Sequence, residues 1–378
     1  MYDVVLLTLA TERGAAAGCG SGGGACCATP ATGDTSAGTP SGTSAGTPSD
    51  TSGGAPSGTS AGTPSGTSAG PACATGDTTS CGDDTGPADP PRVPVLRCAD
   101  ALTDAGARVE TVTAYSDAEI DEVLARLDGP PRPDGLTFPD PDSKTRLVIA
   151  TGSDAQLRAV LRRMVRRYAP PPSRRPDDLA GNRTVPDLPP IGILPLDPDR
   201  GGAQRDLVAQ LGLPREPAAV AAAVLAGRTR RLDLLRNDGG SVTLDGALLG
   251  AADESGRPLH WRGRVEVDDA VLATGEEPLL ACAVGNAGGY ARLDGLPLLT
   301  DPDPADGRID VAVAVPVVTR GRWGRKRMRF EVRRASGRAV AVIPRDSDVP
   351  YLDDGVEATL NRKRSWWIEP QAWAVFTG

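Results

Sequence analysis

The fold of this chain is indicated most clearly by one stretch, Leu147-Val148-Ile149-Ala150-Thr151-Gly152-Ser153-Asp154-Ala155-Gln156-Leu157. Arg146–Ala150 is apolar at every position after its first residue, which is typical of a strand buried on both faces. Gly152–Asp154 forms a turn, and Ala155–Tyr168 then has the apolar spacing of an amphipathic helix. A strand, a glycine turn and a helix in this order predict one unit of a parallel α/β sheet.

Strand and helix patterns alternate on both sides of this unit. Val4–Leu9 and Ile191–Leu196 are apolar runs typical of buried strands. The helical patterns cover Val95–Ala105, Ser116–Leu127 and Pro217–Ala226, with a further helix expected near Arg205–Leu211. We therefore expect residues 1–13 and 92–227 to form an α/β nucleotide-binding domain with a parallel sheet.

The pattern changes at Arg228, after which short strand-like runs follow one another with almost no helix between them. They are Leu232–Leu235, Ser241–Leu244, Arg264–Val267, Leu279–Val284, Ile309–Val315, Arg329–Arg333 and Ala339–Ile343. The pattern predicts a β-rich second domain over 228–364, an antiparallel sandwich. Residues 365–378 are expected to form a last strand that returns to the first domain.

Residues 14–91 consist mostly of Gly, Ser, Thr, Ala and Pro, and interrupt the first domain. The unit Ser-Gly-Thr-Ser-Ala-Gly-Thr-Pro occurs at Ser41–Pro48 and again at Ser57–Pro64. Such a sequence buries too little apolar surface to offset its ordering entropy, so we expect disorder. An inserted loop is the favoured interpretation, and a tether is the alternative.

The bulk composition limits the classes of function. A formal net charge of -8 argues against a nucleic-acid-binding protein. The seven cysteines show no C-x-x-C spacing, which argues against a zinc site. The apolar run at Met1–Ala10 is too short to span a membrane or to serve as a signal peptide, so we expect a cytoplasmic protein.

The order of these features resembles the bacterial diacylglycerol kinase and sphingosine kinase family, whose nucleotide domain is similar to that of NAD kinases. Gly152–Gln156 lies where that family has Gly-Gly-Asp-Gly-Thr, and Ile191–Leu196 resembles the strand that follows. Four later segments also resemble the family in order: Ala226–Asp233, Ala283–Tyr290, Pro302–Val311 and Leu352–Glu357. The resemblance covers both ends of the chain and everything from about Val93 onward.

The resemblance implies a lipid kinase that uses ATP and Mg²⁺ to phosphorylate the hydroxyl of a diacylglycerol-like lipid. A glycine loop at a helix N-terminus offers backbone amides and the positive end of the helix dipole to phosphate. The nucleotide residues that it implies are Thr113, Gly152, Ser153, Asp154, Ala155 and Gln156. A helix N-cap is the alternative interpretation of Asp154.

The chain departs from the family pattern at the nucleotide loop. Ser153 and Ala155 add side chains where the family has glycine, and Gln156 replaces a threonine. Pro198 stands where a second phosphate-side threonine is expected, and it has neither a hydroxyl nor a backbone donor. The alternative function is therefore a degenerate family member that binds lipid or nucleotide without turnover.

The resemblance also implies a catalytic base and a metal site. Asp354 matches the aspartate that deprotonates the lipid hydroxyl, and Glu357 lies one residue after the family's glutamate. An Asp-Gly β-turn is the alternative. The metal ligands would be Asp306 by its side chain and Asp303 and Arg308 by backbone oxygens, with an acidic turn without metal as the alternative.

A basic cluster within Arg320–Arg329, which contains Trp323, suggests contact with anionic lipid headgroups. A solvated hairpin is the alternative interpretation and is favoured. The resemblance itself implies a lipid substrate at a membrane surface as the partner, with peripheral binding at the inner membrane face. The resemblance leaves a homodimer open.

Overall fold

The computed structural model describes residues 2–10, 93–197, 206–252, 257–293, 296–320, 326–345 and 348–378, which all belong to one compact unit. The predicted disorder of 14–91 and the predicted effect of Pro198 lie outside the described residues. Within the basic cluster, Arg322, Trp323 and Arg325 lie outside them as well.

Four strands form the parallel part of the larger sheet. They are β2 (Arg108–Ala114), β1 (Asp3–Leu9), β3 (Thr145–Thr151) and β4 (Pro190–Pro195), side by side in that order. Their carboxyl ends therefore meet at one edge, and this edge carries the turn that follows β3.

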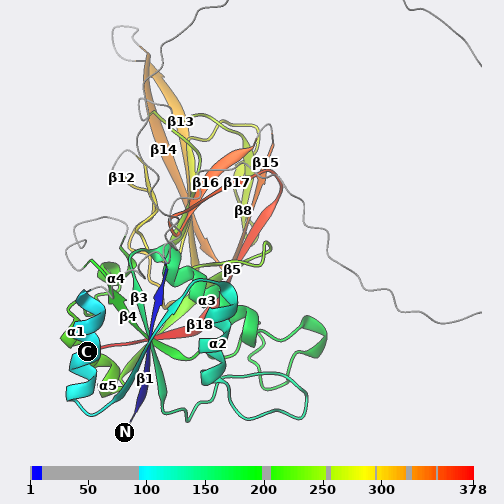
Figure 1. Cartoon of the computed structure of the whole chain (residues 1–378). Coiled ribbons are helices and arrows are strands. Elements are labelled where there is room, and N and C mark those ends of the chain that lie inside the picture. The colour runs from blue at the N-terminus through cyan, green and yellow to red at the C-terminus, as the bar shows by residue number, and fades with distance from the viewer. Residues whose placement is uncertain are drawn as a thin grey trace, which may run out of the picture. The chain divides into compact units, whose positions relative to one another are not determined.

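Helices cover both faces of this parallel sheet (Figure 1). On one face lie α2 (Asp117–Leu124), continued by a 3₁₀ turn at Ala125–Leu127, and α3 (Asp154–Tyr168). On the other face lie α1 (Val93–Asp104) and α5 (Pro217–Ala226). Alternate residues of β1 enter the two apolar layers, which explains why its apolar run is continuous.

The last strand, β18 (Arg364–Phe376), joins the parallel strands to antiparallel ones. Its end pairs in parallel with β4, and it pairs antiparallel with β5 (Thr229–Asn237) and β15 (Ala339–Pro344). The register of β18 on β5 shifts between Glu369 and Trp373. The sheet continues through β8 (Gly263–Val267) to β9 (Ala270–Thr274), and β6 (Val242–Thr243) pairs with β5.

A second, antiparallel sheet packs on this extension. Its strands in order are β14 (Lys326–Gly337), β13 (Ile309–Arg320), β10 (Ala281–Gly285), β7 (Gly246–Leu249), β16 (Val349–Asp353) and β17 (Val356–Leu360). Side chains of both sheets share one apolar cluster, in which the rings of Tyr351 and Trp366 meet edge-on with centroids 6.4 Å apart. Two packed sheets with a common core form a sandwich.

The predicted fold class, a parallel α/β part followed by an antiparallel β-rich part, is therefore confirmed. The remaining short elements are the helix α4 (Leu207–Gln210), a 3₁₀ turn at Pro172–Arg174 and the strand pair β11 (Arg292–Leu293) and β12 (Leu296–Pro297). The domain limits drawn from the sequence stay predictions, because β18 belongs to the same sheet as strands of both parts.

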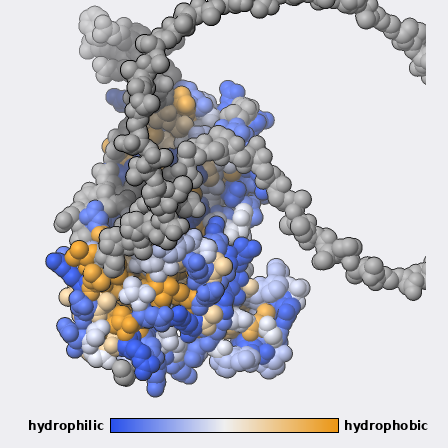
Figure 2. Space-filling model, in the orientation of Figure 1, coloured by the Kyte–Doolittle hydropathy of each residue, from blue (hydrophilic) through white to orange (hydrophobic). Residues whose placement is uncertain are grey.

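Apolar residues gather on the surface around α1 (Figure 2), where Val93 is 60% and Leu96 47% exposed. In the described part of the chain, no helix is both long enough and apolar enough to cross a membrane.

Candidate active site

The segment Gly152–Gln156, called the Gly152 loop below, joins β3 to α3 at the carboxyl edge of the parallel sheet and includes the first residues of the helix. Thr151 ends the strand, and the helix begins at Asp154 after the extended N-cap residue Ser153. The amide of Gly152 donates a hydrogen bond to Gln156 Oε1 at 2.8 Å, and the amide of Ser153 donates to Thr151 Oγ1 at 3.1 Å. The loop thus has the predicted strand–turn–helix form, and its own side chains engage its first two amides.

A small cavity of about 30 Å³ lies beside this loop, with room for roughly two waters. Its lining residues are Thr151, Gly152, Ser153, Asp154, Pro195, Asp197, Asp206, Val208 and Arg215. Asp206 is the N-cap of α4, where it accepts the Ala209 amide at 3.2 Å, and it pairs with Arg215 at 2.6 Å. Carboxylates and one guanidinium therefore line the space next to the loop.

Asp154 is the first residue of α3, so the N-cap interpretation applies to Ser153 instead. The Asp154 side chain is buried, and its Oδ2 accepts a hydrogen bond from the Tyr290 hydroxyl at 3.2 Å. Burial, followed by the charge of Asp245, raises the pKa of Asp154 to about 7, although a hydrogen bond from the Leu207 amide opposes the rise. This carboxyl therefore titrates near neutral pH.

Asp245 is a second buried carboxylate in contact with the same group of residues. It accepts hydrogen bonds from Gln210 Nε2 at 2.7 Å and from the amide of Gly289 at 2.9 Å. Burial raises its pKa to about 6. A Cβ atom at Gly289 would collide with both Asp245 and Gln210, so this close approach requires glycine.

Asp354 lies in the tight turn between β16 and β17, where it has φ 48 and Gly355 has φ 84. Two successive left-handed residues are typical of a type I′ hairpin. The Asp354 side chain is 0% exposed and accepts the amides of Leu244 at 2.7 Å, Asp245 at 2.9 Å and Gly246 at 3.1 Å. Burial and the neighbouring Asp353 raise its pKa well above the ordinary value.

The turn interpretation therefore describes the backbone of Asp354, and its predicted role as a base stays a prediction. Glu357, the second residue predicted for catalysis, is exposed on β17, opposite Leu352.

Arg158 connects α3 to the Asp354 turn. It donates to Asp353 Oδ2 at 2.7 Å and to the carbonyl of Val242 at 2.7 Å, and its Nε lies 3.8 Å from Asp354 Oδ2. Tyr290 approaches the same turn, because a Cβ atom at Gly355 would lie 3.1 Å from its hydroxyl. The structure thus brings the Gly152 loop and the Asp354 turn together through Arg158 and Tyr290.

Two other predicted nucleotide residues contribute less to this arrangement. Ala155 is half-buried as the second residue of α3. Thr113 is exposed near the carboxyl end of β2, and β1 lies between β2 and β3. Thr113 is therefore on the expected edge of the sheet but outside the lining of the loop cavity.

The residues predicted to bind a metal ion, Asp303, Asp306 and Arg308, lie in a turn that hydrogen-bonds to Asp233. The buried Asp233 carboxylate accepts the amide of Gly307 at 2.6 Å. Within the turn, Asp303 Oδ1 accepts the Ala305 amide at 3.0 Å and Asp306 Oδ1 accepts the Arg308 amide at 2.8 Å. No three His, Cys, Asp or Glu side chains of the described residues are grouped to hold a metal ion. The roles of Asp303, Asp306 and Arg308 stay predictions.

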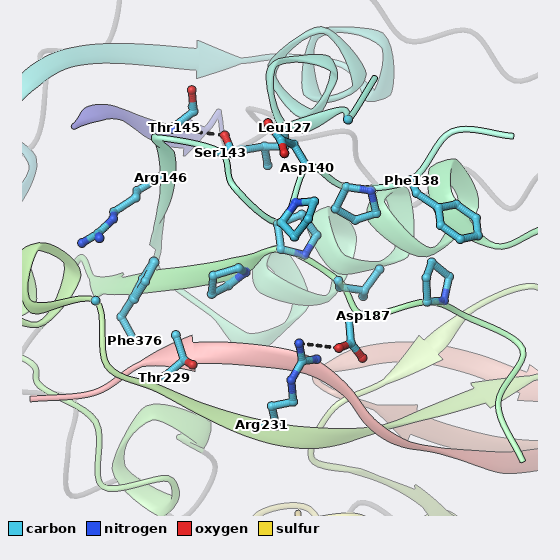
Figure 3. A pocket seen from close by; sticks show the side chains of 18 of the residues that line it. Leu127, Phe138, Asp140, Ser143, Thr145, Arg146, Asp187, Thr229, Arg231 and Phe376 are labelled. Carbon is cyan, nitrogen blue, oxygen red and sulfur yellow. Dashed lines mark hydrogen bonds and ion pairs between the residues drawn. The ribbon is translucent and has the colours of Figure 1, made fainter. Parts of the chain in front are cut away.

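A larger cavity, of about 650 Å³, lies at the start of β3 and β4 and thus at the other edge of the sheet (Figure 3). Prolines and Phe138 line it, and the ion pair of Arg231 with Asp187, at 2.6 Å, forms part of one side. It contains none of the predicted site residues.

Comparison with known proteins identifies the fold. No protein-family model matches the sequence, and no curated protein matches it. Among solved structures, a putative diacylglycerol kinase from Bacillus anthracis str. Sterne matches with a TM-score of 0.50 at 11% identity, over 75% of this chain and 91% of that chain. The chain has a diacylglycerol kinase-like fold.

Two further structures match more loosely. A diacylglycerol kinase from the same organism has a TM-score of 0.49 at 12% identity, over 75% of this chain and 90% of that chain. An NAD kinase from Archaeoglobus fulgidus in complex with ATP has a TM-score of 0.42 at 12% identity, over 75% and 89%. At these identities the likeness defines a kinase-type fold alone, and activity has to be argued from the site.

Proposed function

We propose that this chain is an ATP-dependent lipid kinase, which transfers a phosphoryl group to the hydroxyl of a diacylglycerol-like lipid. One observation supports the proposal above all: the Gly152 loop and the Asp354 turn, about 200 residues apart in the sequence, meet through Tyr290 and Arg158. Phosphoryl transfer needs the nucleotide phosphates close to the carboxyl that takes the proton of the accepting hydroxyl, and this contact brings buried carboxyls next to the loop.

The nucleotide phosphates would bind at the start of α3. The amides of the loop and the positive end of the 15-residue helix favour phosphate there. The carboxyl edge of a parallel sheet is also where open α/β folds bind their ligands. The loop cavity is small, so phosphate binding requires side chains of the loop to move.

Asp154 and Asp206 fit a divalent cation at this cavity. Both line it, both are buried, and each offers the carboxylate oxygens that Mg²⁺ prefers. Bound Mg²⁺ would neutralise the negative charge that develops on the transferring phosphoryl group. The raised pKa of Asp154 fits this role, since Asp245 and Asp206 both raise it and a cation would offset their charge.

The proton acceptor must be a carboxyl that can reach the lipid hydroxyl. With three backbone amides on its carboxylate, Asp354 holds the turn closed. It could take a proton from the lipid hydroxyl only after the turn opens. Asp154 borders the loop cavity and is 9% exposed, which makes it the more accessible carboxyl, but a cation bound to it would keep it from accepting the proton.

A cavity in the β-rich part could take up apolar chain of a lipid. Its volume is about 220 Å³, and leucine, alanine, glycine and proline residues form most of its lining between β7 and β11. Leu248, Leu280 and Leu293 contribute side chains, and Arg292 is the charged residue of the lining. We propose that this cavity receives part of an acyl chain while the protein is bound peripherally at a membrane surface.

The test is a transfer assay with γ-labelled ATP, Mg²⁺ and mixed micelles that contain diacylglycerol, a sphingoid base or a monoacylglycerol. Asp154→Asn is the test variant, and Asp269→Asn, at an exposed position in the β-rich part, is its matched control. We expect labelled lipid with the wild type and the control, and a loss of about 100-fold or more with Asp154→Asn. Label in the lipid fraction no higher than with Asp154→Asn would reject the proposal.

A nucleotide- or lipid-binding protein without turnover is the second candidate. The hydrogen bond from Gly152 to Gln156 and the saturated carboxylate of Asp354 favour it, because both engage groups that catalysis would need. A ligand that binds only the native state raises the melting temperature. A shift with ATP but no labelled lipid would favour this candidate over the kinase.

A further inference from the structure

We infer that Gln156 sets the affinity of the Gly152 loop for nucleotide, because its side-chain oxygen occupies the place of a phosphate oxygen on the Gly152 amide. The inference rests on the proposed nucleotide site at this loop. It concerns one contact, the hydrogen bond of 2.8 Å from Gly152 N to Gln156 Oε1.

The contact closes the loop on itself. Gln156 is the third residue of α3, and its side chain turns back over the N-terminus of the helix. It accepts the amide of Gly152, one residue before the N-cap Ser153, whereas a capping box uses the N-cap amide itself. The orientation of the carboxamide is fixed, because a backbone amide can be accepted only by Oε1. Thr151 Oγ1 lies 3.5 Å from the same oxygen but donates its single proton to the carbonyl of Ser153, so the Gly152 amide is the donor that holds Oε1.

The Gly152 amide, which donates to Gln156, is the amide of the loop best suited to phosphate. Gly152 is the single glycine of the loop, whereas Ser153 and Ala155 carry side chains that restrict close approach. With the carboxamide in place, the cavity beside the loop has a volume of only about 30 Å³. A phosphate must therefore displace Gln156 before it can use the Gly152 amide.

The size of the effect follows from the hydrogen bond that is exchanged. A neutral intramolecular hydrogen bond of this kind has a modest net strength, equivalent to roughly a 2- to 10-fold change in affinity. Removing the acceptor should therefore tighten nucleotide binding by about that factor. A carboxylate at the same position should act in the opposite direction, because it accepts the amide more strongly and repels phosphate.

The experiment measures the dissociation constant of ATP, with Mg²⁺ present, for the full chain and four variants by calorimetric titration. Gln156→Ala removes the acceptor, and Gln156→Met removes it while keeping a side chain of similar length. Gln156→Glu keeps an acceptor and adds a negative charge. Arg166→Ala, at an exposed position of the same helix, is the control. Thermal melting without nucleotide checks that each variant is folded.

We expect tighter ATP binding by roughly 2- to 10-fold in Gln156→Ala and Gln156→Met, weaker binding in Gln156→Glu, and no change in Arg166→Ala. Binding in either neutral variant when the wild type shows none would also support the inference. Wild-type binding that Gln156→Ala and Gln156→Met leave equal or weaken would overturn it, while the nucleotide site would stand. No ATP binding in any of the five proteins would overturn both.

Discussion

Tyr290 donates a hydrogen bond from its hydroxyl to Asp154 Oδ2 at 3.2 Å, across 136 residues of sequence. Both side chains are buried, so the bond joins the β-rich part to the first turn of α3 in a water-poor environment. The same hydroxyl lies close to Gly355, next to Asp354. Tyr290 thus contacts the first residue of α3 and lies beside the Asp354 turn.

Replacing Tyr290 by phenylalanine should destabilise the protein. The variant Tyr290→Phe keeps the ring but leaves the buried Asp154 carboxyl without this donor, which should lower the free energy of unfolding by about 1–3 kcal/mol. Tyr115→Phe is the matched control, since Tyr115 is 66% exposed. Urea unfolding measures both, and equal midpoints for the two variants would contradict the role given to Tyr290.

The variant Asp154→Asn should stabilise the protein in a pH-dependent way. The pKa of Asp154 is about 7 in the folded state and about 4 in an unfolded chain. The folded state therefore binds the extra proton between these values, and the stability that this proton provides is lost as the pH rises from about 4 to about 7.

An asparagine has no such loss, so the difference in unfolding free energy between Asp154→Asn and the wild type should grow with pH. We expect a growth of about 2–4 kcal/mol between about pH 4 and about pH 8. Urea unfolding across this range measures it. A difference that stays constant with pH would show that Asp154 has an ordinary pKa.

Asp354 should behave as a structural residue. The variant Asp354→Ala leaves the amides of Leu244, Asp245 and Gly246 without their acceptor and places alanine at a positive φ, so we expect a loss of about 3 kcal/mol or more. Asp354→Asn should lose less, because asparagine tolerates this conformation and keeps one acceptor oxygen. Asp269→Ala is the control, and a loss no larger than its own would refute the structural role.

Arg158 and Asp353 should be strongly coupled. Asp353 is almost fully buried and depends on Arg158 and on Thr243, whose hydroxyl donates to it at 2.7 Å. Arg158→Ala alone should cost about 3–5 kcal/mol, because it leaves a buried carboxylate without its cation. In a double-mutant cycle with Asp353→Asn, the double variant should lose much less stability than the sum of the two single losses. Additive losses would mean that the ion pair does not hold the turn to α3.

Much of the α/β part could be predicted because its signals are local. The helix expected at Pro217–Ala226 has these same ends in the structure, with proline in its first turn and Gly227 at φ 72 after its last residue. The helix expected at Ala155–Tyr168 begins one residue earlier. In contrast, α4 is only one turn long, where a longer helix is expected near Arg205–Leu211.

The β-rich part is predicted less completely. The sequence pattern does not indicate β7 (Gly246–Leu249), which is a short apolar run without alternation, or β16 (Val349–Asp353), which has proline at its second position. The two strands pair with each other across a long stretch of sequence, and such pairing has no local signature. The Asp354–Gly355 turn, through which β16 also pairs with β17, is the local signal for β16.

The candidate site shows the same limit. The sequence indicates Gly152, Asp154 and Asp354 through short motifs. Tyr290 ends the family-like segment Ala283–Tyr290 but is given no role there, and Asp245, Gln210 and Arg158 belong to no motif. These residues become neighbours only through tertiary contacts. One signal was available: two glycines precede Tyr290, and the second allows Asp245 to approach closely.

Transfer of the γ-phosphoryl group from labelled ATP to diacylglycerol in mixed micelles tests the proposed function most directly. We predict labelled phosphatidic acid with the wild type, little change with Asp269→Asn, and a loss of about 100-fold or more with Asp154→Asn. Wild-type protein that is folded and binds ATP, but gives no more labelled lipid than Asp154→Asn, would contradict the kinase proposal.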